Sequence, residues 1–118
     1  MTAFRNLTKQ KPPVLAWQKL KNYVLGGKYE LSLVLAGDRL LKNLNKRYRK
    51  KNKSADILSF SLSKNQGEIF INLKRCRRDL AFFYIHGLLH LKGLSHGVKM
   101  KNKEEAIMKK FGIKNYGK

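Results

Sequence analysis

The sequence has few acidic residues: 7 are Asp or Glu, whereas 27 are Lys or Arg, and the formal net charge of the 118-residue chain is +20. Repulsion among so many positive charges disfavours a compact chain, so we expect a polyanionic partner. Nucleic acid and an anionic membrane surface are the two partner classes that fit. Hydrophobic residues make up 42% of the chain, which excludes a disordered protein.

Cysteine is nearly absent, and long apolar runs are absent altogether. Cys76 is the only cysteine, which excludes an internal disulfide and favours a reducing compartment. No apolar run approaches the roughly 18 to 20 residues that span a bilayer, and Met1–Lys11 does not resemble a signal peptide. We therefore expect a cytoplasmic protein with no membrane partner and no disulfide partner, for which rRNA or another RNA is the polyanion.

The length of the chain predicts one domain over residues 1–118. The pattern of apolar residues predicts an α/β fold, in which helices and strands follow one another in an α+β-like order. Helical spacing of apolar residues predicts helices at Pro13–Leu25, Leu40–Tyr48, Leu80–Leu91 and Lys103–Phe111. Alternation and turn residues predict strands at Tyr29–Ala36, Ile57–Leu62 and Glu68–Asn72, a hairpin turn at Ser63–Gly67 and an extended segment around Phe4–Leu7. Asp38 and Asn72 are candidate helix N-caps.

The segment Leu80–Leu91 is apolar on every side except at His86 and His90. A helix that is apolar all round lies buried at the centre of a domain. We therefore predict a small mixed sheet and several helices that pack around this one central helix.

All three histidines of the chain fall in one short segment, HGLLHLKGLSH, from His86 to His96. His86 and His90 are four residues apart, so on a helix they share a face, with roughly 5 to 6 Å between their Cβ atoms. Gly93 can adopt a positive φ, end the helix and turn the chain back, so that His96 completes a set of three nitrogen ligands. Three neutral imidazoles with one open position are typical of a catalytic zinc site.

The alternative to a metal site is a group of buried histidines with ordinary hydrogen-bond partners. Three histidines placed at random in this chain adopt the observed spacing in roughly 4 of 10,000 cases, so chance is a poor explanation. Two imidazoles on an apolar helix would also leave polar nitrogens in need of partners. We therefore predict one metal ion per chain, with zinc favoured by the ligand type and nickel, copper and iron left open.

The spacing H-x-x-x-H-x-x-G-x-x-H also occurs in metzincin metalloproteases. In those enzymes a glutamate, the general base, follows the first histidine, whereas Gly87 stands at that position here. The sequence therefore has the ligand spacing of a metzincin without its base, which disfavours proteolysis as the function.

Two basic runs suggest a binding surface for phosphate groups. Lys42–Lys53 contains seven Lys or Arg and no acid, and Lys74–Arg78 forms a second basic group before the histidine helix. Such runs are often solvated helix faces, but the charge of the whole chain favours a phosphate-binding track. Tyr48 could stack a nucleobase, although we expect it in the core. The candidate RNA-binding residues are Arg47, Arg49, Lys50, Lys51, Lys53, Arg75 and Arg78.

Three stretches of the chain, between about Leu44 and Tyr116, match the motifs of one known family. The most specific motif is H-G-x-L-H-L-x-G-x-D-H, which His86–His96 matches. The supporting motifs are L-N-x-x-Y-R, V-L-S-F-P and G-D-I, matched at Leu44–Arg49, Ile57–Phe60 and Gly67–Ile69. The chain thus resembles the YbeY family of bacterial rRNA maturation factors, described as zinc-dependent endoribonucleases.

The resemblance implies an α/β fold with the zinc helix at its centre, and cleavage of single-stranded RNA. It also implies a role in maturing small-subunit rRNA, at the 3′ end of 16S rRNA, and in ribosome quality control, with the small ribosomal subunit as a partner. Arg49 falls on a functionally important arginine of the family. A guanidinium suits that position because it is always charged and can clamp a phosphate through two hydrogen bonds. The implied catalytic set is Arg49, His86, His90 and His96.

The chain departs from the family pattern at two places. Ser95 replaces the aspartate before the third histidine, where a carboxylate could orient a ligand. Asn52, Ser54 and Ala55 replace the Asp-Pro-Thr of a loop. Because Gly87 leaves the general base unassigned, zinc-activated water and the RNA's own 2′-OH are both open as the attacking group. The alternative function is a non-catalytic ribosome-assembly factor that binds RNA and holds a structural zinc.

Overall fold

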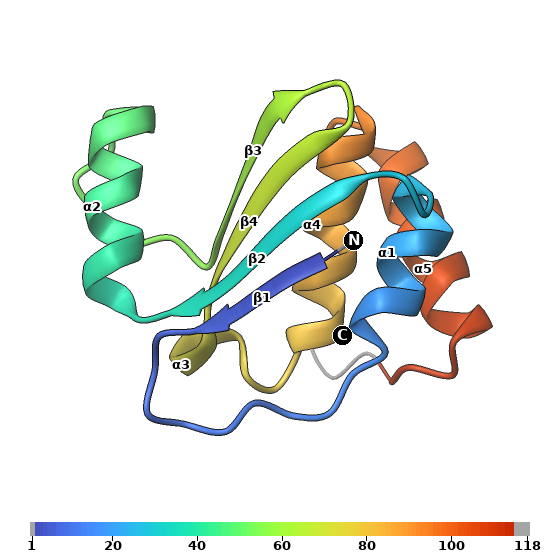
Figure 1. The fold of residues 1–118 in the computed structure, drawn as a ribbon, viewed down its shortest axis with the longest axis horizontal. Helices are drawn as coiled ribbons and strands as arrows, with labels where there is room; N and C mark the ends of the chain where they lie inside the picture. The colour runs from blue at the N-terminus through green and yellow to red at the C-terminus, as the bar shows by residue number, and fades with distance from the viewer. Residues whose placement is uncertain (1, 115–118) are drawn as a thin grey trace.

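A four-stranded sheet and five helices form the structure of residues 2–114, which the computed structural model describes (Figure 1). The strands are β1 (Thr2–Asn6), β2 (Glu30–Ala36), β3 (Ile57–Ser63) and β4 (Gln66–Asn72). The helices are α1 (Trp17–Leu25), α2 (Asp38–Arg49), α3 (Leu73–Cys76), α4 (Leu80–Lys92) and α5 (Val98–Lys110). Tyr116, at the predicted end of the family resemblance, lies outside the described residues.

The sheet is mixed, as the sequence predicted, and its strand order is β1-β2-β4-β3. β1, β2 and β4 run parallel, and β3 pairs antiparallel with β4 as an edge strand. The register places Leu33 of β2 opposite Ile69 of β4, and Ile69 opposite Ser59 of β3. Because side chains alternate between the two faces of a sheet, these three residues share one face.

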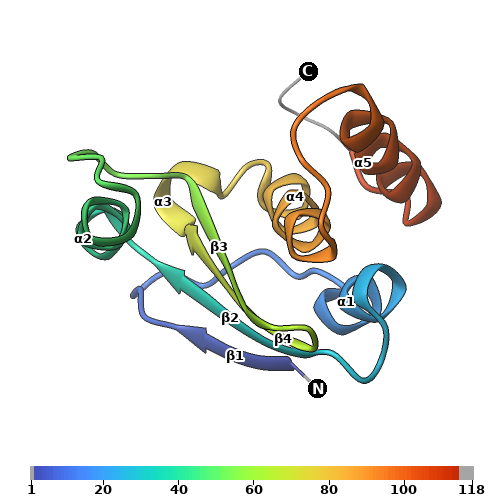
Figure 2. The same cartoon turned by 90° about the horizontal axis from the view of Figure 1, so that it is seen from above.

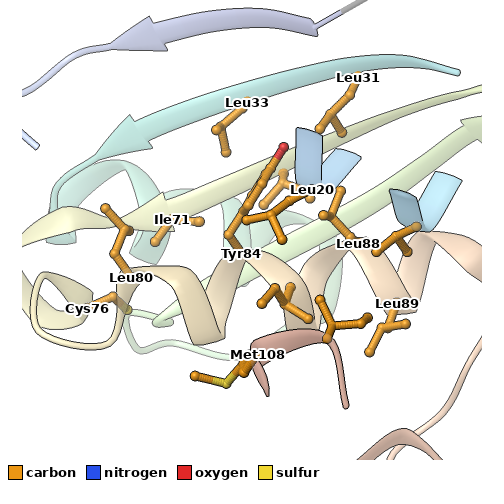
Figure 3. Packing of buried hydrophobic residues seen from close by; sticks show 14 of the residues in the cluster. Leu20, Leu31, Leu33, Ile71, Cys76, Leu80, Tyr84, Leu88, Leu89 and Met108 are labelled. Carbon is orange, nitrogen blue, oxygen red and sulfur yellow. The ribbon is translucent and has the colours of Figure 1, made fainter. Parts of the chain in front are cut away.

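This face packs against α4, which also contacts α1 and α5. Figure 2 shows α4 between the sheet and α5. Tyr84, Ile85 and Leu88 of α4 are completely buried, and the Tyr84 hydroxyl donates to the Trp17 carbonyl at 2.8 Å. Figure 3 shows Tyr84 and Leu88 among the side chains of this core. The prediction of a central apolar helix is therefore confirmed.

Gly87 marks a close contact between α4 and the sheet. A Cβ atom at this position would lie 2.9 Å from Cδ1 of Ile57 and 3.1 Å from Cδ1 of Ile69. The Ser59 hydroxyl oxygen would lie 3.1 Å away as well, so a larger residue would require these side-chain ends to shift. The packing of helix on sheet thus favours glycine at the position where metzincins carry their base.

The opposite face of the sheet packs against α2. Val34 of β2 and Leu58 of β3 both lie opposite Phe70 of β4, so the three share this face. Together with Leu41 of α2 they form a second, smaller apolar cluster. The C-terminal end of α2, which includes Arg49, is thereby held beside the edge strand β3.

Tyr48, in the last turn of α2, is 59% exposed, so the expectation that it belongs to the core is wrong. Its ring packs edge-on against Phe60 of β3, with 5.3 Å between the ring centroids. Because β3 is an edge strand, no further strand adds contacts beyond Phe60, and most of the tyrosine ring stays in solvent.

Two helices begin at other residues than predicted. α1 begins at Trp17 rather than at Pro13. Val14, which the helical spacing placed on the apolar face, is 94% exposed and does not contribute to that face. α5 begins earlier than predicted, at Val98, because Met100 is buried and extends the inward face into a lysine-rich segment.

The predicted N-caps have different outcomes. Asn72 is the N-cap of the short helix α3, which was not predicted, and its side chain accepts a hydrogen bond from the Arg75 N–H at 3.3 Å. The N-cap of α2 is Gly37, so the prediction of Asp38 is wrong. The Asp38 carboxylate instead accepts from Asn72 Nδ2 at 2.6 Å and from the Ser54 hydroxyl at 3.2 Å. These bonds fasten the loop after α2 to the end of β4.

The single cysteine is buried, and its thiol donates to the Asp56 carbonyl at 3.3 Å. Burial is the main cause that raises the pKa of Cys76 to about 12, so the thiol stays protonated and unreactive at neutral pH. Separately, none of the helices within residues 2–114 is long and apolar enough to cross a membrane.

Candidate metal centre

The C-terminal half of α4 presents two histidines on one face. His86 and His90 are four residues apart, and their ring centroids lie 4.6 Å from each other. Their Nε2 atoms face one another at 3.1 Å. Both side chains are partly buried, as expected for polar groups on an otherwise apolar helix. The predicted pairing along the helix is confirmed.

Gly93 ends α4 and turns the chain so that the third histidine returns to the first two. Its φ is +110°, its N–H donates to His90 O at 3.0 Å, and the next N–H donates to Leu89 O at 3.0 Å. These bonds form a Schellman motif. The ring of His96 consequently lies 4.9 Å from that of His86 and 4.8 Å from that of His90. One nitrogen of each ring lies within 4.8 Å of the other two, so this group can hold a metal ion.

Hydrogen bonds determine which nitrogen of each neutral ring is unprotonated. His90 Nδ1 lies 3.1 Å from Leu94 O, and since a carbonyl only accepts, Nδ1 must be the donor. His86 Nδ1 contacts the Glu104 carboxylate, which selects the same tautomer. With this tautomer, the Nε2 atoms of the two rings are the ones that remain to bind a metal ion.

The donor set fits a metal ion. Two nitrogen lone pairs that face each other at 3.1 Å repel unless a cation or a proton lies between them. Tetrahedral zinc, with bonds of about 2.0–2.1 Å, separates two nitrogen ligands by about 3.3–3.4 Å, which is close to that distance. The exposed ring of His96 supplies a third donor from the loop after α4.

Glu104 is a residue of this site that the sequence analysis missed. It lies on α5, is 6% exposed, and its carboxylate contacts His86 Nδ1. A sequence signal was present, because Glu104 has helical spacing with Met100, Ile107 and Met108, all of which are buried. An acid on the inward face of a helix is unusual and marks a position where it has a specific partner.

A cavity of about 490 Å³ opens beside the three histidines. Ile57, Ser59 and Ser61 line it from the edge strand β3, because alternation turns these residues toward α4. Arg49 and the Asp56 side chain also line the cavity. The structure therefore brings Arg49, from a distant part of the sequence, to the metal-ligand group. The sequence analysis did not single out Asp56.

Arg49 and Asp56 also line a second cavity, of about 390 Å³, which is bordered by Lys51, Lys53 and Arg75. Asn45 Nδ2 donates to Lys53 O at 2.9 Å and thereby fixes this basic loop against α2. Arg75 forms an exposed ion pair with Asp56 at 3.0 Å. Four predicted RNA-binding residues thus share one basic pocket next to the histidine cavity.

The other three predicted RNA-binding residues lie outside this pocket. The Arg47 guanidinium lies 5.8 Å from the ring centroid of Tyr48, at the exposed end of α2. Lys50 follows α2 in a left-handed backbone conformation, with φ 59°. Arg78 lines a different cavity, beside the start of α4.

The pKa of His90 is lowered from its usual value of 6.5, chiefly because burial disfavours the charged imidazolium. The neighbouring rings of His86 and His96 lower it further, whereas the bond to Leu94 O opposes the shift. The Arg49 guanidinium has the smallest effect, also in the lowering direction. A neutral His90 at physiological pH is the form that binds a metal ion.

The sequence model of the family described as Endoribonuclease YbeY matches residues 10–112. The chain belongs to the YbeY endoribonuclease family. The match begins well before Leu44, where the motif resemblance began, and it includes Arg49, the three histidines and Glu104.

Curated relatives agree with the YbeY assignment, and a solved structure has a similar fold. A protein named Endoribonuclease YbeY from Halalkalibacterium halodurans is 30% identical over 119 aligned positions, which cover 74% of this chain and 75% of the relative. The protein of the same name from Ehrlichia canis is 38% identical over 106 positions, covering 72% and 69%. The fold is similar to the solution structure of a Thermotoga maritima protein, with a TM-score of 0.63, 19% identity and coverage of 100% and 99%.

We expect the pKa of His90 in the metal-free protein to lie below 6.5, because burial favours its neutral form. The pKa of His90 is lower in the folded protein than in the unfolded chain. Its contribution to the free energy of unfolding is therefore fully present above about pH 6.5. It is lost as the pH falls through the folded pKa. An NMR titration of the three histidine rings, assigned with a His90→Gln variant, measures this pKa. A midpoint at or above 6.5 would contradict the expectation.

Gly93→Ala should weaken metal binding together with stability. A Cβ atom in a backbone with φ +110° strains the helix end by roughly 1–2 kcal/mol and disturbs the turn that positions Leu94 O and His96. We expect zinc affinity to fall by about 10-fold. Gly26→Ala is the matched control, because Gly26 ends α1 with φ +93° and open space around it. Equal zinc affinity of the two variants in a chelator competition would show that the turn does not position the ligands.

Proposed function

We propose that this YbeY-family protein is a zinc-dependent endoribonuclease that cleaves single-stranded RNA. One arrangement supports the proposal: three histidines line an open cavity together with Arg49, and Arg49 also lines the adjoining basic pocket. A group able to hold a metal ion therefore lies next to a surface suited to phosphates. Metal-dependent cleavage of a phosphodiester uses these two features side by side.

His86, His90 and His96 would hold one zinc ion per chain. Three histidine nitrogens are a common ligand set of catalytic zinc, and the hydrogen bonds of His86 and His90 leave Nε2 of each ring available. Bound zinc supplies Lewis-acid activation of a phosphoryl oxygen and of water. The cavity beside the rings provides space for the substrate phosphate.

Arg49 would bind the phosphate that is cleaved and stabilise the negative charge that develops on it. A guanidinium forms two parallel hydrogen bonds with phosphate oxygens and stays charged at all physiological pH values. Lys51, Lys53 and Arg75 would bind neighbouring phosphates, because they border the pocket on the far side of Arg49. An RNA strand would then run from the histidine cavity past Arg49 to the loop after α2.

We further propose that the substrate is small-subunit rRNA, cleaved at the 3′ end of 16S rRNA during ribosome assembly and quality control in the cytoplasm. The resemblance of the motifs to those of rRNA maturation factors supports this assignment. The net charge of +20 supports it as well, because a ribosomal particle exposes dense phosphate. The small ribosomal subunit would be the partner, and residues 1–118 would act as one domain.

The alternative is a non-catalytic assembly factor with a structural zinc ion. Structural zinc sites are closed by four protein ligands. In the part of the chain that the structure describes, the group contains three histidines and lies beside an open cavity, which favours the enzyme. A metalloprotease is disfavoured, because Gly87 supplies no base at the position where a metzincin carries its glutamate.

The central test combines metal analysis with RNA cleavage. We expect purified protein to contain about one zinc per chain and to cleave a single-stranded rRNA fragment, with activity lost on chelation and restored by zinc. His90→Ala should lose both zinc and cleavage, by more than about 100-fold, because it removes a ligand. Cleavage that persists in metal-stripped, nuclease-free protein would refute the mechanism. Product ends with 2′,3′-cyclic phosphate would identify the 2′-OH as the attacking group.

Arg49→Ala separates the enzyme from the assembly factor. We expect cleavage to fall by roughly 100-fold or more, since Arg49 would stabilise the transition state, while zinc content and ribosome binding stay close to wild type. Arg39→Ala is the matched control, because it removes the same charge from the exposed first turn of α2, away from the histidine cavity. If Arg49→Ala and Arg39→Ala cleave at equal rates, Arg49 has no catalytic role.

A further inference from the structure

We propose that Glu104 is a positioning residue of the metal centre, which holds the His86 ring so that its Nε2 atom is available to the metal ion. The inference rests on the proposed metal site and adds a residue on α5 that takes part in it. It concerns a carboxylate that contacts a ligand and does not itself belong to the group of three metal-binding side chains.

The contact between Glu104 and His86 joins two side chains that are largely buried. The Glu104 carboxylate meets His86 Nδ1, and the side chains of His86 and Glu104 are 16% and 8% exposed. A carboxylate accepts, so Nδ1 is the donor and the ring is held in one orientation and one tautomer. The arrangement is that of carboxylate–histidine–zinc triads, in which the carboxylate orients the imidazole ligand.

The choice of partner argues for a role in metal binding. The chain has 27 Lys and Arg, yet among the described residues the ion pair of Glu104 is with His86, a side chain that is charged only when protonated. A buried carboxylate without a cation nearby is strongly destabilising. A metal ion on the far side of the imidazole would add positive charge close to this buried carboxylate.

The position of Glu104 is set by the core and not by the loop that precedes α5. Met100, Ile107 and Met108 anchor the same face of α5 in the apolar cluster, and α5 packs on α4. His90 is oriented in a different way, by the Leu94 carbonyl of the turn after α4. His86 is therefore the ligand whose orientation depends on a side chain from another helix.

Zinc affinity of full-length variants tests the inference, measured by competition with a chromophoric chelator. We expect Glu104→Gln and Glu104→Ala to bind zinc about 10- to 100-fold more weakly than wild type. Glu105→Gln is the matched control, because it removes the same charge from the neighbouring, exposed position of α5 and should bind zinc as wild type does. Circular dichroism melts establish that each variant is folded, and if Glu104→Ala does not fold, the near-isosteric Glu104→Gln decides.

NMR provides a readout that a purely structural role would not change. In the zinc-loaded wild type, the His86 Nδ1–H proton should be visible, since its bond to a buried carboxylate slows exchange with water. We expect this resonance to be lost in Glu104→Ala and retained in Glu105→Gln.

Zinc affinities of Glu104→Gln and Glu105→Gln within threefold of each other would overturn the inference, although the proposed metal site would stand. A wild-type protein that binds no zinc would instead refute the metal site itself.

Discussion

The packing of α4 against the sheet is the interaction on which the candidate metal centre depends. α4 is apolar on almost all sides, so it is buried between the sheet and α5, and Gly87 allows close approach to Ile57 and Ile69. This contact places the histidine end of α4 beside the edge strand β3. The residues that β3 turns toward the helix there include two serines, which leaves an open cavity where a larger apolar side chain would have filled the space.

The same packing explains why the residues around the histidines come from several elements. In a metzincin the base is on the ligand helix itself, whereas here that position is a glycine in close contact with the sheet. The other polar groups of the centre therefore come from elsewhere: Arg49 from the end of α2 and Glu104 from α5. Each is held by an apolar contact of its own helix, so the fold positions groups that lie far apart in the sequence.

The ligand group was predictable because its geometry is local. The four-residue spacing of His86 and His90 and the glycine at position 93 determine the arrangement once a helix forms, and apolar residues on all sides indicate that helix. Glu104 was not predicted, because its partner depends on how α5 docks on α4, which no local pattern encodes. The place of Arg49 was known only through family resemblance, and the exposure of Tyr48 depends on β3 being an edge strand.

The scarcity of acids connects the surface to the metal centre. The chain has 7 Asp and Glu, and three of them have specific partners in the structure: Asp38 bonds to Asn72 and Ser54, Asp56 pairs with Arg75, and Glu104 contacts His86. Most lysines and arginines consequently have no carboxylate to neutralise them. The positive potential of the surface is therefore left for an external polyanion, and it extends through Arg49 to the edge of the histidine cavity. A phosphodiester strand that followed this surface would neutralise its charge and reach the three histidines in a single binding mode.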